Sequence, residues 1–563
     1  MSTRSGAEYI AGFLNTHGVT HVFYVEAILR RTLVEMEKLG IQRILAHSEK
    51  AAAYMADGYA RMALRPGVCM AQSVGAANLS AGLQDAFLGH TPVVAFTGSK
   101  PPVFQYRNAY QEINHNAMFD PVTKYNVKVD AVEQLPILLP QAWREATTGT
   151  PGPVHVDFLG YEGNLTDEAE GDFGQLQETA YSRYPAHRPV AAQADLELTA
   201  QALKDASRPV LVVGRGAIVS GAAPEINRIV DMLSIPVVTS VDGKAVMLDN
   251  HPLFAGPCGT YCRPCANEIL SHADLVFFVG TSTGDQLTQN WKLPPQGSTI
   301  IQLDINPIEI GRNYPGVVGL MGDAKLTLQK LLPLIELLPK KDAWAEEAIE
   351  IIQIWRRVVK PYCDSDDIPV RPERLCREIT AVLPQNAILV ADTGYTAIWA
   401  GSLINLNHAG QSFLRAAGSL GWAFPAAIGA KCAAPDRPVF CFSGDGAFWY
   451  HLCELETAAR RGIKTITIIN NNSRLGQSVL GIRRAYRDDP GAKEQQYAFR
   501  DTNFARIAED MGCFGVRVER PDEIQTAIRQ AMEQNKPAVV DVVTEGDAHP
   551  ILKYNLFRKM KSS

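Results

Sequence analysis

The sequence is poor in the features that would direct a protein to a membrane, to nucleic acid or out of the cell. It has no run of about 18 uninterrupted apolar residues, so we expect no membrane span. Its N-terminus, MSTRSGAEYIAGFLNTHG, lacks an apolar stretch followed by a small-residue cleavage site, so we expect no secretion signal. Acidic and basic residues are intermixed, the net charge is -6 at pH 7, and no basic run indicates a nucleic-acid partner. We therefore predict a cytoplasmic protein.

The ten cysteines give little indication of disulfide or metal chemistry. Most are scattered through apolar stretches, a usage typical of reduced, buried thiols. Cys258, Cys262 and Cys265 form a C-x3-C-x2-C pattern that iron–sulfur proteins also use, but no fourth ligand is apparent. We interpret these three as incidental cysteines, and iron in the purified protein would overturn that interpretation.

The chain does contain the alternation of short apolar runs and helical patterns that is typical of parallel α/β units. Its 563 residues are too many for one hydrophobic core. The alternation occurs in three segments, separated by polar or charged linkers and spanning residues 1–170, 190–340 and 365–550. We predict the α/β class, with three doubly wound parallel-sheet domains.

The clearest chemical signal is a carboxylate and an amide at the ends of two neighbouring strands. The run VFCFSGDGAF places Asp445 at the end of a predicted buried strand, and KTITIINNN places Asn470–Asn472 at the end of the next. One helical pattern separates the two runs. Both groups should therefore lie at the carboxyl edge of one sheet, where open α/β sheets bind ligands.

Such an oxygen-rich set suits Mg²⁺ or Ca²⁺ rather than zinc. With so few protein ligands, Mg²⁺ would complete its coordination with phosphate and water. The small residues Gly446 and Ala447 allow close backbone approach at a helix start, where phosphate binds well. The pattern predicts a phosphate-bearing cofactor held through Mg²⁺; the alternative is a tight turn followed by an asparagine-capped loop.

GDG followed by NN after one strand–helix–strand unit resembles the cofactor motif of thiamine-diphosphate (ThDP) enzymes. The most similar patterns are those of acetolactate synthase, benzaldehyde lyase and the related 2-oxo acid decarboxylases and carboligases. The resemblance implies that Asp445, Asn472 and the main-chain oxygen of Arg474 bind the metal. It places three small residues beside the cofactor, namely Gly446, Ala447 and Gly476. It spans nearly the whole chain and implies pyrimidine-binding, central and diphosphate-binding domains, in that order.

Motifs in the first segment resemble the same family. HSEKAAAYMADGYAR carries Glu49 in the family's E-x5-M-A-x-G-Y-A-R arrangement, which implies that Glu49 protonates the cofactor's aminopyrimidine ring. QSVGAANL and YQE imply cofactor or active-site roles for Ser73, Gly75, Asn78 and Gln111. Taken alone, Glu49 could equally be a carboxylate that the helix dipole favours at a helix start.

Two stretches in the third segment complete the resemblance. RAAGSLGWAFPAAIGAK matches the segment that bends the cofactor, which implies that Leu420 is the wedge between its rings and that the Gly418 carbonyl accepts from its amine. ADTGYTAIW matches the segment that holds the diphosphate, which implies contacts from Thr393, Gly394, Tyr395 and Thr396.

The resemblance implies an acetolactate synthase-like carboligase that decarboxylates a 2-oxo acid and passes the acyl unit to an aldehyde or ketone. One alternative is a lyase that cleaves a 2-hydroxy ketone or a 2-hydroxyacyl or oxalyl thioester. The other is an FAD-containing oxidoreductase of the pyruvate oxidase kind. The family also forms homodimers or homotetramers with active sites at the subunit interface, where the glutamate of one chain serves cofactor held mainly by another.

The sequence departs from the family pattern at three places. FYVEA replaces a glycine-containing stretch and leaves Glu26 near the position where benzaldehyde lyase has a histidine, so Glu26 is either an acid/base group or a solvated loop carboxylate. Gly481 replaces the tryptophan that helps acetolactate synthases select their acceptor. STGDQLTQ replaces the FAD-binding stretch of the middle domain, which makes FAD the less favoured interpretation.

Overall fold

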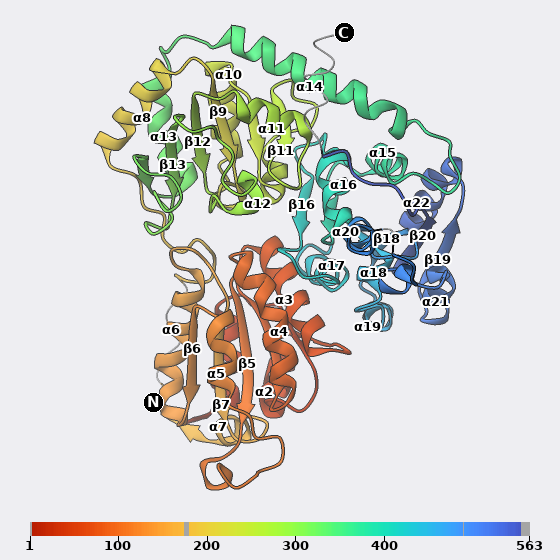
Figure 1. The fold of residues 1–563 in the computed structure, drawn as a ribbon. Coiled ribbons are helices and arrows are strands. Elements are labelled where there is room, and N and C mark those ends of the chain that lie inside the picture. The colour runs from red at the N-terminus through yellow and green to blue at the C-terminus, as the bar shows by residue number, and fades with distance from the viewer. Residues whose placement is uncertain (1–2, 174–179, 488, 553–563) are drawn as a thin grey trace.

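A computed structural model describes residues 3–173, 180–487 and 489–552. The chain forms three domains, each built on a six-stranded sheet in which every strand pairing is parallel (Figure 1). Helices cover both faces of each sheet, so the predicted class of three doubly wound α/β domains is confirmed. None of the helices in the described ranges is long and apolar enough to cross a membrane.

The N-terminal domain has the strand order β3-β2-β4-β5-β7-β6. Its strands are β2 (His21–Tyr24), β3 (Gln42–Leu45), β4 (Gly67–Gln72), β5 (Val93–Ser99), β6 (Tyr125–Val129) and β7 (Val154–Leu159). Its helices are α1 (Gly6–Thr16), α2 (Arg30–Lys38), α3 (Glu49–Ala63), α4 (Gly75–Leu88), α5 (His115–Phe119), α6 (Leu135–Thr147) and α7 (Asn164–Glu168). A short antiparallel pair, β1 (Arg4–Ser5) and β8 (Glu170–Gly171), ties its two ends together.

Alternate residues of the buried strands explain why helices cover both faces of this sheet. In β4, Val68 and Met70 join the core formed with α1 and α6, whereas Cys69 and Ala71 join the core formed with α3 and α4. Since successive strand side chains point to opposite faces, a strand that is apolar at every position must be covered on both sides.

The middle domain has the order β11-β10-β9-β12-β13-β14, which is the strand order of dinucleotide-binding folds. Its strands are β9 (Pro209–Val213), β10 (Val237–Thr239), β11 (Phe254–Pro257), β12 (Leu275–Val279), β13 (Thr299–Asp304) and β14 (Val318–Met321). Its helices are α8 (Gln193–Asp205), α9 (Arg215–Ser220), α10 (Ala223–Leu233), α11 (Pro264–Ser271), α12 (Asp285–Thr288) and α13 (Ala324–Ile335). The long helix α14 (Asp342–Cys363) then leads to the third domain.

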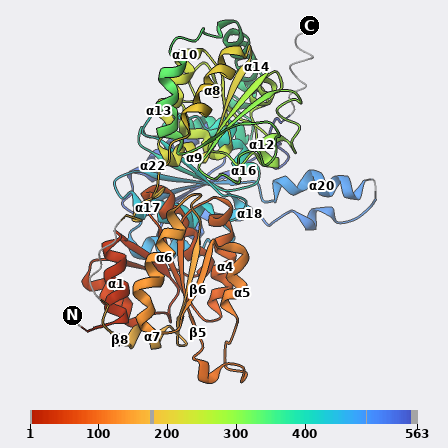
Figure 2. The same cartoon turned by 90° about the vertical axis from the view of Figure 1, so that its left-hand side faces the viewer.

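The C-terminal domain has the order β16-β15-β17-β18-β20-β19, which repeats the topology of the N-terminal domain strand for strand. Its strands are β15 (Ile388–Ala391), β16 (Ser412–Arg415), β17 (Val439–Gly444), β18 (Thr465–Asn471), β19 (Phe514–Val518) and β20 (Ala538–Val543). Its helices are α15 (Pro372–Val382), α16 (Tyr395–Leu403), α17 (Ala423–Ala433), α18 (Asp445–Phe448), α19 (Glu454–Arg461), α20 (Gly476–Tyr486), α21 (Phe504–Asp510) and α22 (Ile524–Glu533). Figure 2 shows α20 standing away from the three domains.

The N- and C-terminal domains join through close contact of α3 with α17. A Cβ added to Gly58 would lie 2.1 Å from the Ala426 carbonyl oxygen, and one added to Gly429 would lie 1.8 Å from that of Met55. The two backbones therefore touch at positions where only glycine fits. This contact fixes where the start of α3 lies relative to the C-terminal sheet.

A buried charge network reinforces this domain junction. Arg61 bonds Asp57 at 2.7 Å and Asp85 at 3.1 Å, and the Trp422 indole N–H donates to Asp57 at 2.8 Å. Burial disfavours the Arg61 charge, but the two carboxylates raise the pKa of Arg61 above its ordinary value. Each charged group of the network therefore has an oppositely charged partner, which buried charges require.

The three cysteines of the C-x3-C-x2-C pattern are free and buried in the middle domain. Cys265 donates to the Ala255 carbonyl oxygen at 3.4 Å, and Cys262 accepts from Asn267 at 3.1 Å. Burial raises the pKa of Cys258 and of Cys265 to about 12. Burial therefore favours the thiol over the thiolate form of these cysteines.

Candidate active site

The predicted residues of the C-terminal domain converge on one cavity of about 370 Å³ at the carboxyl edge of its sheet. The cavity is lined by Thr393, Gly394, Tyr395, Thr396, Gly418, Leu420, Asp445, Gly446, Ala447, Asn472, Arg474 and Gly476. These residues come from loops that follow four strands, β15, β16, β17 and β18. The fold therefore gathers into one space what the sequence spreads over more than eighty positions.

The predicted metal ligands lie at the ends of adjacent strands. Gly444 of β17 pairs with Asn470 of β18, so Asp445 and Asn472 follow directly on neighbouring strands. Asp445 is only 2% exposed, and burial raises its pKa to about 7 although backbone N–H groups, that of Asn472 first, oppose the shift. A buried carboxylate with so little solvation is one that a bound cation would stabilise.

The three consecutive asparagines have different environments. Asn471 donates to Asp541 at 2.8 Å and to the Thr502 carbonyl at 3.0 Å, so its side chain is held in the protein interior. Asn472 faces the cavity and accepts from the Arg474 N–H at 3.3 Å. The Asn470 Oδ1 also borders the cavity, is buried, and has no hydrogen-bond partner in the described part of the chain. An unpaired buried acceptor fits a site that holds a polar ligand.

Asp392 organises the predicted diphosphate and wedge segments, and the sequence analysis did not assign it a role. Its carboxylate accepts from the backbone N–H of Thr393, Gly421 and Ala423, at 2.9, 3.0 and 2.9 Å. Burial raises the pKa of Asp392 to about 6. Its position directly after a buried strand, in ILVAD, was the available signal.

A second carboxylate, Asp85, performs the same task from the N-terminal domain. It accepts from the backbone N–H of Ala417 and of Ser419, both at 3.0 Å. Burial raises the pKa of Asp85, while Arg61 opposes that shift. Asp85 thus holds the loop that carries Gly418 and Leu420, although more than 300 positions separate the two in sequence.

The middle domain also contributes to the cavity, which the sequence did not indicate. Tyr261 and Gln286 line it. The Gln477 amide donates to the Tyr261 hydroxyl at 3.0 Å, and Arg415 donates to Gln286 at 2.9 Å. Neither residue belongs to a recognisable motif, so only the tertiary structure reveals them.

The predicted residues of the N-terminal domain form a second group. Glu49 begins α3, accepts from Asn78 at 3.1 Å, and its Oε1 lies 2.5 Å from where a Cβ on Gly75 would be. Ser73 donates to the Gln111 carbonyl at 2.8 Å. The sheet and α4 therefore bring Glu49, Ser73, Gly75, Asn78 and Gln111 to one edge of this domain.

Gln111 is oriented by a neighbour that the sequence analysis missed. The Tyr161 hydroxyl donates to the Gln111 Oε1 at 2.5 Å. The Lys100 ammonium lies 3.2 Å from the centre of the Tyr161 ring, a close cation–π contact. Lys100 and Tyr161 follow β5 and β7, whose carboxyl ends lie at the same edge as Glu49.

The two groups do not share a cavity within one chain. The described residues that line the C-terminal cavity belong to the middle and C-terminal domains only, and Glu49 is not among them. The start of α3 instead faces α19, where the His47 N–H donates to Glu454 at 3.0 Å. A single chain therefore presents two incomplete halves of the predicted site.

Glu26 lies in the segment after β2 and does not line the C-terminal cavity. Its side chain is 63% exposed and forms an ion pair with Arg30 at 2.8 Å, and Arg30 also contacts Glu162 at 2.9 Å. An exposed pair of this kind contributes little to stability.

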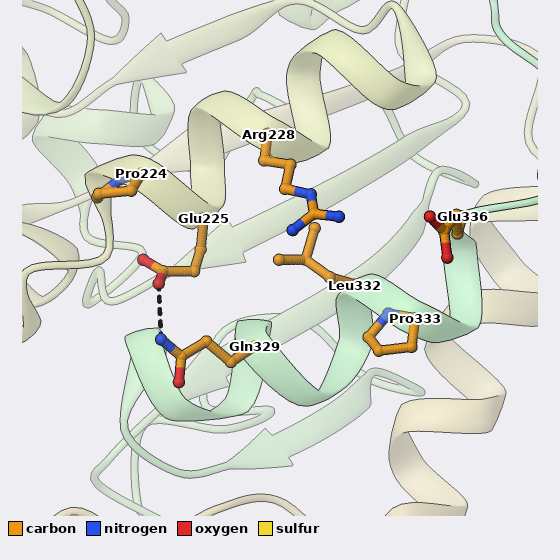
Figure 3. Close-up of a pocket in the computed structure, with 7 residues that line it drawn as sticks. All are labelled: Pro224, Glu225, Arg228, Gln329, Leu332, Pro333 and Glu336. Carbon is orange, nitrogen blue, oxygen red and sulfur yellow. Dashed lines mark hydrogen bonds between the residues drawn. The ribbon is translucent and has the colours of Figure 1, made fainter.

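A further hollow, of about 320 Å³, lies on the middle domain between α10 and α13 (Figure 3). Gln329 donates to Glu225 at 2.8 Å across it, and Arg228 and Glu336 border it with Leu332. It contains none of the residues predicted from sequence to form a site.

Comparison with known proteins agrees with this geometry. Three thiamine pyrophosphate enzyme family models match, the N-terminal TPP-binding domain over residues 4–118, the central domain over 196–331 and the C-terminal TPP-binding domain over 392–542. The probable acetolactate synthase large subunit of Methanocaldococcus jannaschii is 31% identical, over 96% of this chain and 92% of its own. The probable acetolactate synthase large subunit of Methanococcus aeolicus is 32% identical over 88% of this chain and 85% of its own. The acetolactate synthase isozyme 1 large subunit of Escherichia coli is 28% identical over 96% of this chain and 93% of its own.

Proposed function

The chain belongs to the family of thiamine-diphosphate-dependent enzymes that includes acetolactate synthase, and we propose that it is a carboligase with a 2-oxo acid donor. In the proposed reaction the donor loses CO₂, and the acyl unit that remains is transferred to an aldehyde or ketone. The convergence of the predicted C-terminal residues on one cavity is the observation that carries this proposal.

The chemistry of the cavity suits the cofactor and its metal. Asp445, Asn472 and the Arg474 carbonyl would hold Mg²⁺, with the buried, poorly solvated Asp445 as the anionic ligand. Gly446 lets the turn after β17 pack closely against the loop after β18, because a Cβ there would lie 2.7 Å from a Leu475 methyl carbon. Thiamine diphosphate, when bound, supplies the carbon nucleophile that adds to the donor's carbonyl group.

The N-terminal group supplies the proton chemistry in this proposal. Glu49 would exchange a proton with the cofactor's ring nitrogen, and Asn78 fixes the carboxylate by donating to its Oε2. Gln111 accepts from Tyr161 through Oε1, which leaves its amide Nε2 available to donate to a substrate oxygen. Leu420 would bend the cofactor, and the Gly418 carbonyl would accept from its amine.

Because one chain keeps these groups apart, we propose that two copies complete each other's active sites in a homodimer or homotetramer. Large apolar side chains are exposed on both halves, which supports such an assembly: Tyr106 (96%) and Tyr110 (76%) in the N-terminal domain, and Tyr450 (55%) in the C-terminal domain. The free cysteines, most of which are buried, fit a reducing compartment, so we place the protein in the cytoplasm.

Two other activities use the same cofactor but are less favoured, because the relatives that match over nearly the whole chain are acetolactate synthase large subunits. A carbon–carbon lyase would cleave a 2-hydroxy ketone or a 2-hydroxyacyl or oxalyl thioester without net ligation. A pyruvate oxidase-like oxidoreductase requires FAD, and a flavin absorption spectrum of the purified protein tests for it. We propose that FAD is not a resident cofactor.

The deciding experiment measures CO₂ release from a panel of 2-oxo acids, pyruvate first, with thiamine diphosphate and Mg²⁺ present. We expect release by the wild type and a loss of about 10²–10⁴-fold in Glu49→Gln, the usual contribution of a positioned acid or base. Glu133→Gln, at an exposed position of the same domain, should be unchanged. If no acid on the panel releases CO₂ although cofactor is bound, the decarboxylating reaction is rejected, and lyase substrates are tested next.

A further inference from the structure

A second cavity, of about 430 Å³, lies where three parts of the molecule meet, away from the cofactor cavity. The middle domain contributes Asp249 and Arg263, and α14 contributes Arg356. The C-terminal domain contributes Arg377 and Asn405. Figure 1 shows α14 running from the middle domain across to the C-terminal domain, so the cavity is built at a junction.

Asp249 and Arg263 form the floor of this cavity, and together with Lys244, which lies behind them, they carry an excess of buried positive charge. Lys244 bonds both oxygens of Asp249, at 3.1 and 3.0 Å, and Arg263 bonds the same carboxylate at 2.5 Å. All three side chains are at most 6% exposed. Two cations thus share one carboxylate, and a buried charge without a counter-charge is costly. Burial lowers the pKa of Lys244 to about 8. Because this value still lies above 7, the ammonium stays largely protonated at pH 7.

The walls add further positive charge and hydrogen-bond donors. Arg356, Lys360 and Arg377 line the cavity, and Asp249 is the sole carboxylate among its described lining residues. Lys360 and Arg377 both pair with Asp364, and Arg377 also lies 3.6 Å from Glu378. Arg356 donates one N–H to the Asp249 carbonyl oxygen at 3.1 Å, and a guanidinium has five donors in total. Such a surplus of donors over acceptors suits an oxyanion.

The charged floor of this cavity is also connected to the cofactor cavity by a single helix. Lys244 donates to the Gly401 carbonyl at 2.9 Å, and Arg263 donates to the Ser402 carbonyl at 2.8 Å, both at the C-terminal end of α16. The first residues of α16, Tyr395 and Thr396, line the cofactor cavity. The two cavities therefore contact opposite ends of one nine-residue helix.

We propose that this junction cavity is a binding site for an oxyanionic small molecule, a phosphate or dicarboxylate compound, held by Arg356 together with Arg263 and Arg377. The anion would neutralise the excess charge of the floor. Because the site is distinct from the cofactor cavity, it offers the protein a place to sense a metabolite that takes no part in the reaction.

Isothermal titration calorimetry with inorganic phosphate and, separately, with succinate tests the site, against chloride at equal ionic strength. The protein is first saturated with thiamine diphosphate and Mg²⁺, so that the diphosphate site is blocked. We expect one of the two anions to bind saturably, and Arg356→Met to weaken its binding at least tenfold, the amount expected when a charge-assisted contact of about 1.4 kcal/mol or more is lost. The anion that binds identifies the ligand class.

Arg357→Met is the matched control, because Arg357 is the next residue on α14, is exposed and does not line the cavity. It should bind the anion like the wild type. Arg377→Met provides a second test on another element in case Arg356→Met folds poorly, which thermal unfolding in chloride would reveal. Binding of neither anion above chloride, or equal binding by wild type, Arg356→Met and Arg377→Met, overturns the proposal.

Discussion

Asp392 and Asp85 show how single carboxylates preorganise a site that they do not themselves line. Asp392 holds three backbone N–H groups, from the segments that follow β15 and β16, and Asp85 holds two more from the segment that follows β16. Charge-assisted bonds to a buried carboxylate are stronger than neutral ones. The loops that carry Thr393, Gly418 and Leu420 are thus fixed before any cofactor binds, which is a requirement for precise positioning.

Glu26 gives the sharpest prediction at the residue scale. We expect Glu26→Gln to change turnover or substrate preference while the affinity for thiamine diphosphate stays unchanged, because Glu26 follows β2 at the same edge as Glu49 yet lies outside the cofactor cavity. Steady-state kinetics on several acceptors, with calorimetry for the cofactor, measures both. Kinetics identical to the wild type would reduce Glu26 to a partner of Arg30 on the surface.

Glycine positions inside two helices give a prediction at the scale of elements. In α17, Gly429→Ala would place a methyl group 1.8 Å from the Met55 carbonyl oxygen of α3, so we expect a loss of stability of about 1–3 kcal/mol or more. In α20, Gly481→Ala meets nothing within 4 Å and should be neutral or stabilising by up to about 1 kcal/mol, since alanine is the better helix former. Thermal unfolding of both variants beside the wild type tests the contrast; equal midpoints would contradict the close contact of α3 with α17.

The N-terminal sheet carries a histidine whose titration should appear in the pH dependence of stability. His155 of β7 is fully buried between Thr97 and Asn126, and burial lowers its pKa from 6.5 to about 3. Below pH 6.5 the unfolded chain binds a proton here that the folded protein does not, so the free energy of unfolding falls by up to about 1.4 kcal/mol per pH unit.

The stability that results from the lowered pKa of His155 is fully present above pH 6.5 and is lost progressively as the pH falls towards 3. We therefore expect His155→Gln, which cannot titrate, to lose less stability than the wild type between pH 7 and pH 5. Thermal midpoints across that range provide the measurement. Parallel pH profiles for the two proteins would show that His155 does not titrate as its burial requires.

At the scale of the whole molecule, the separation of Glu49 from the cofactor cavity predicts complementation between chains. Glu49→Gln and Asp445→Ala should each be inactive. In a mixed dimer, one site combines the intact Glu49 of one chain with the intact Asp445 of the other. Random exchange of subunits should therefore restore about a quarter of wild-type activity, since half of the dimers are mixed and each has one intact site.

The measurement is the rate of CO₂ release after equal amounts of the two variants have been unfolded and refolded together, or expressed together. Refolding each variant alone is the control. If the mixture stays inactive although mixed dimers form, Glu49 and the cofactor cavity of the same chain must cooperate, and the inter-chain site is rejected.

The third domain illustrates how much of the site could be predicted from local sequence. Buried strands that end in GDG and NNN place their polar residues at a carboxyl edge whatever their surroundings, so the positions of Asp445 and of the Asn470–Asn472 group were predictable from pattern alone, whereas the choice of Asn472 came from the family resemblance. Asp392 lay within reach of the same argument. Local sequence could not predict four other residues, because each reaches its partner through contacts between distant segments. They are Asp85, Tyr261, Gln286 and Tyr161.

The repeated topology shows the same limit for the fold. The N- and C-terminal sheets share one strand order, yet their sequences give no repeat strong enough to detect. Many different apolar residues can fill a strand or helix of given length, so a topology can recur while its sequence does not.

The sequence by itself determined the α/β class, the number of domains and the strand-end residues that the C-terminal domain places in its cavity, because alternating apolar runs and strand-end motifs are local properties. Only the tertiary structure decided which of these residues meet. It brought the C-terminal set together, kept Glu49 apart from it, and built a cationic cavity at the junction of three parts of the chain. Those outcomes depend on how the domains pack against one another, which for α3 and α17 rests on backbone contacts as close as those at Gly58 and Gly429.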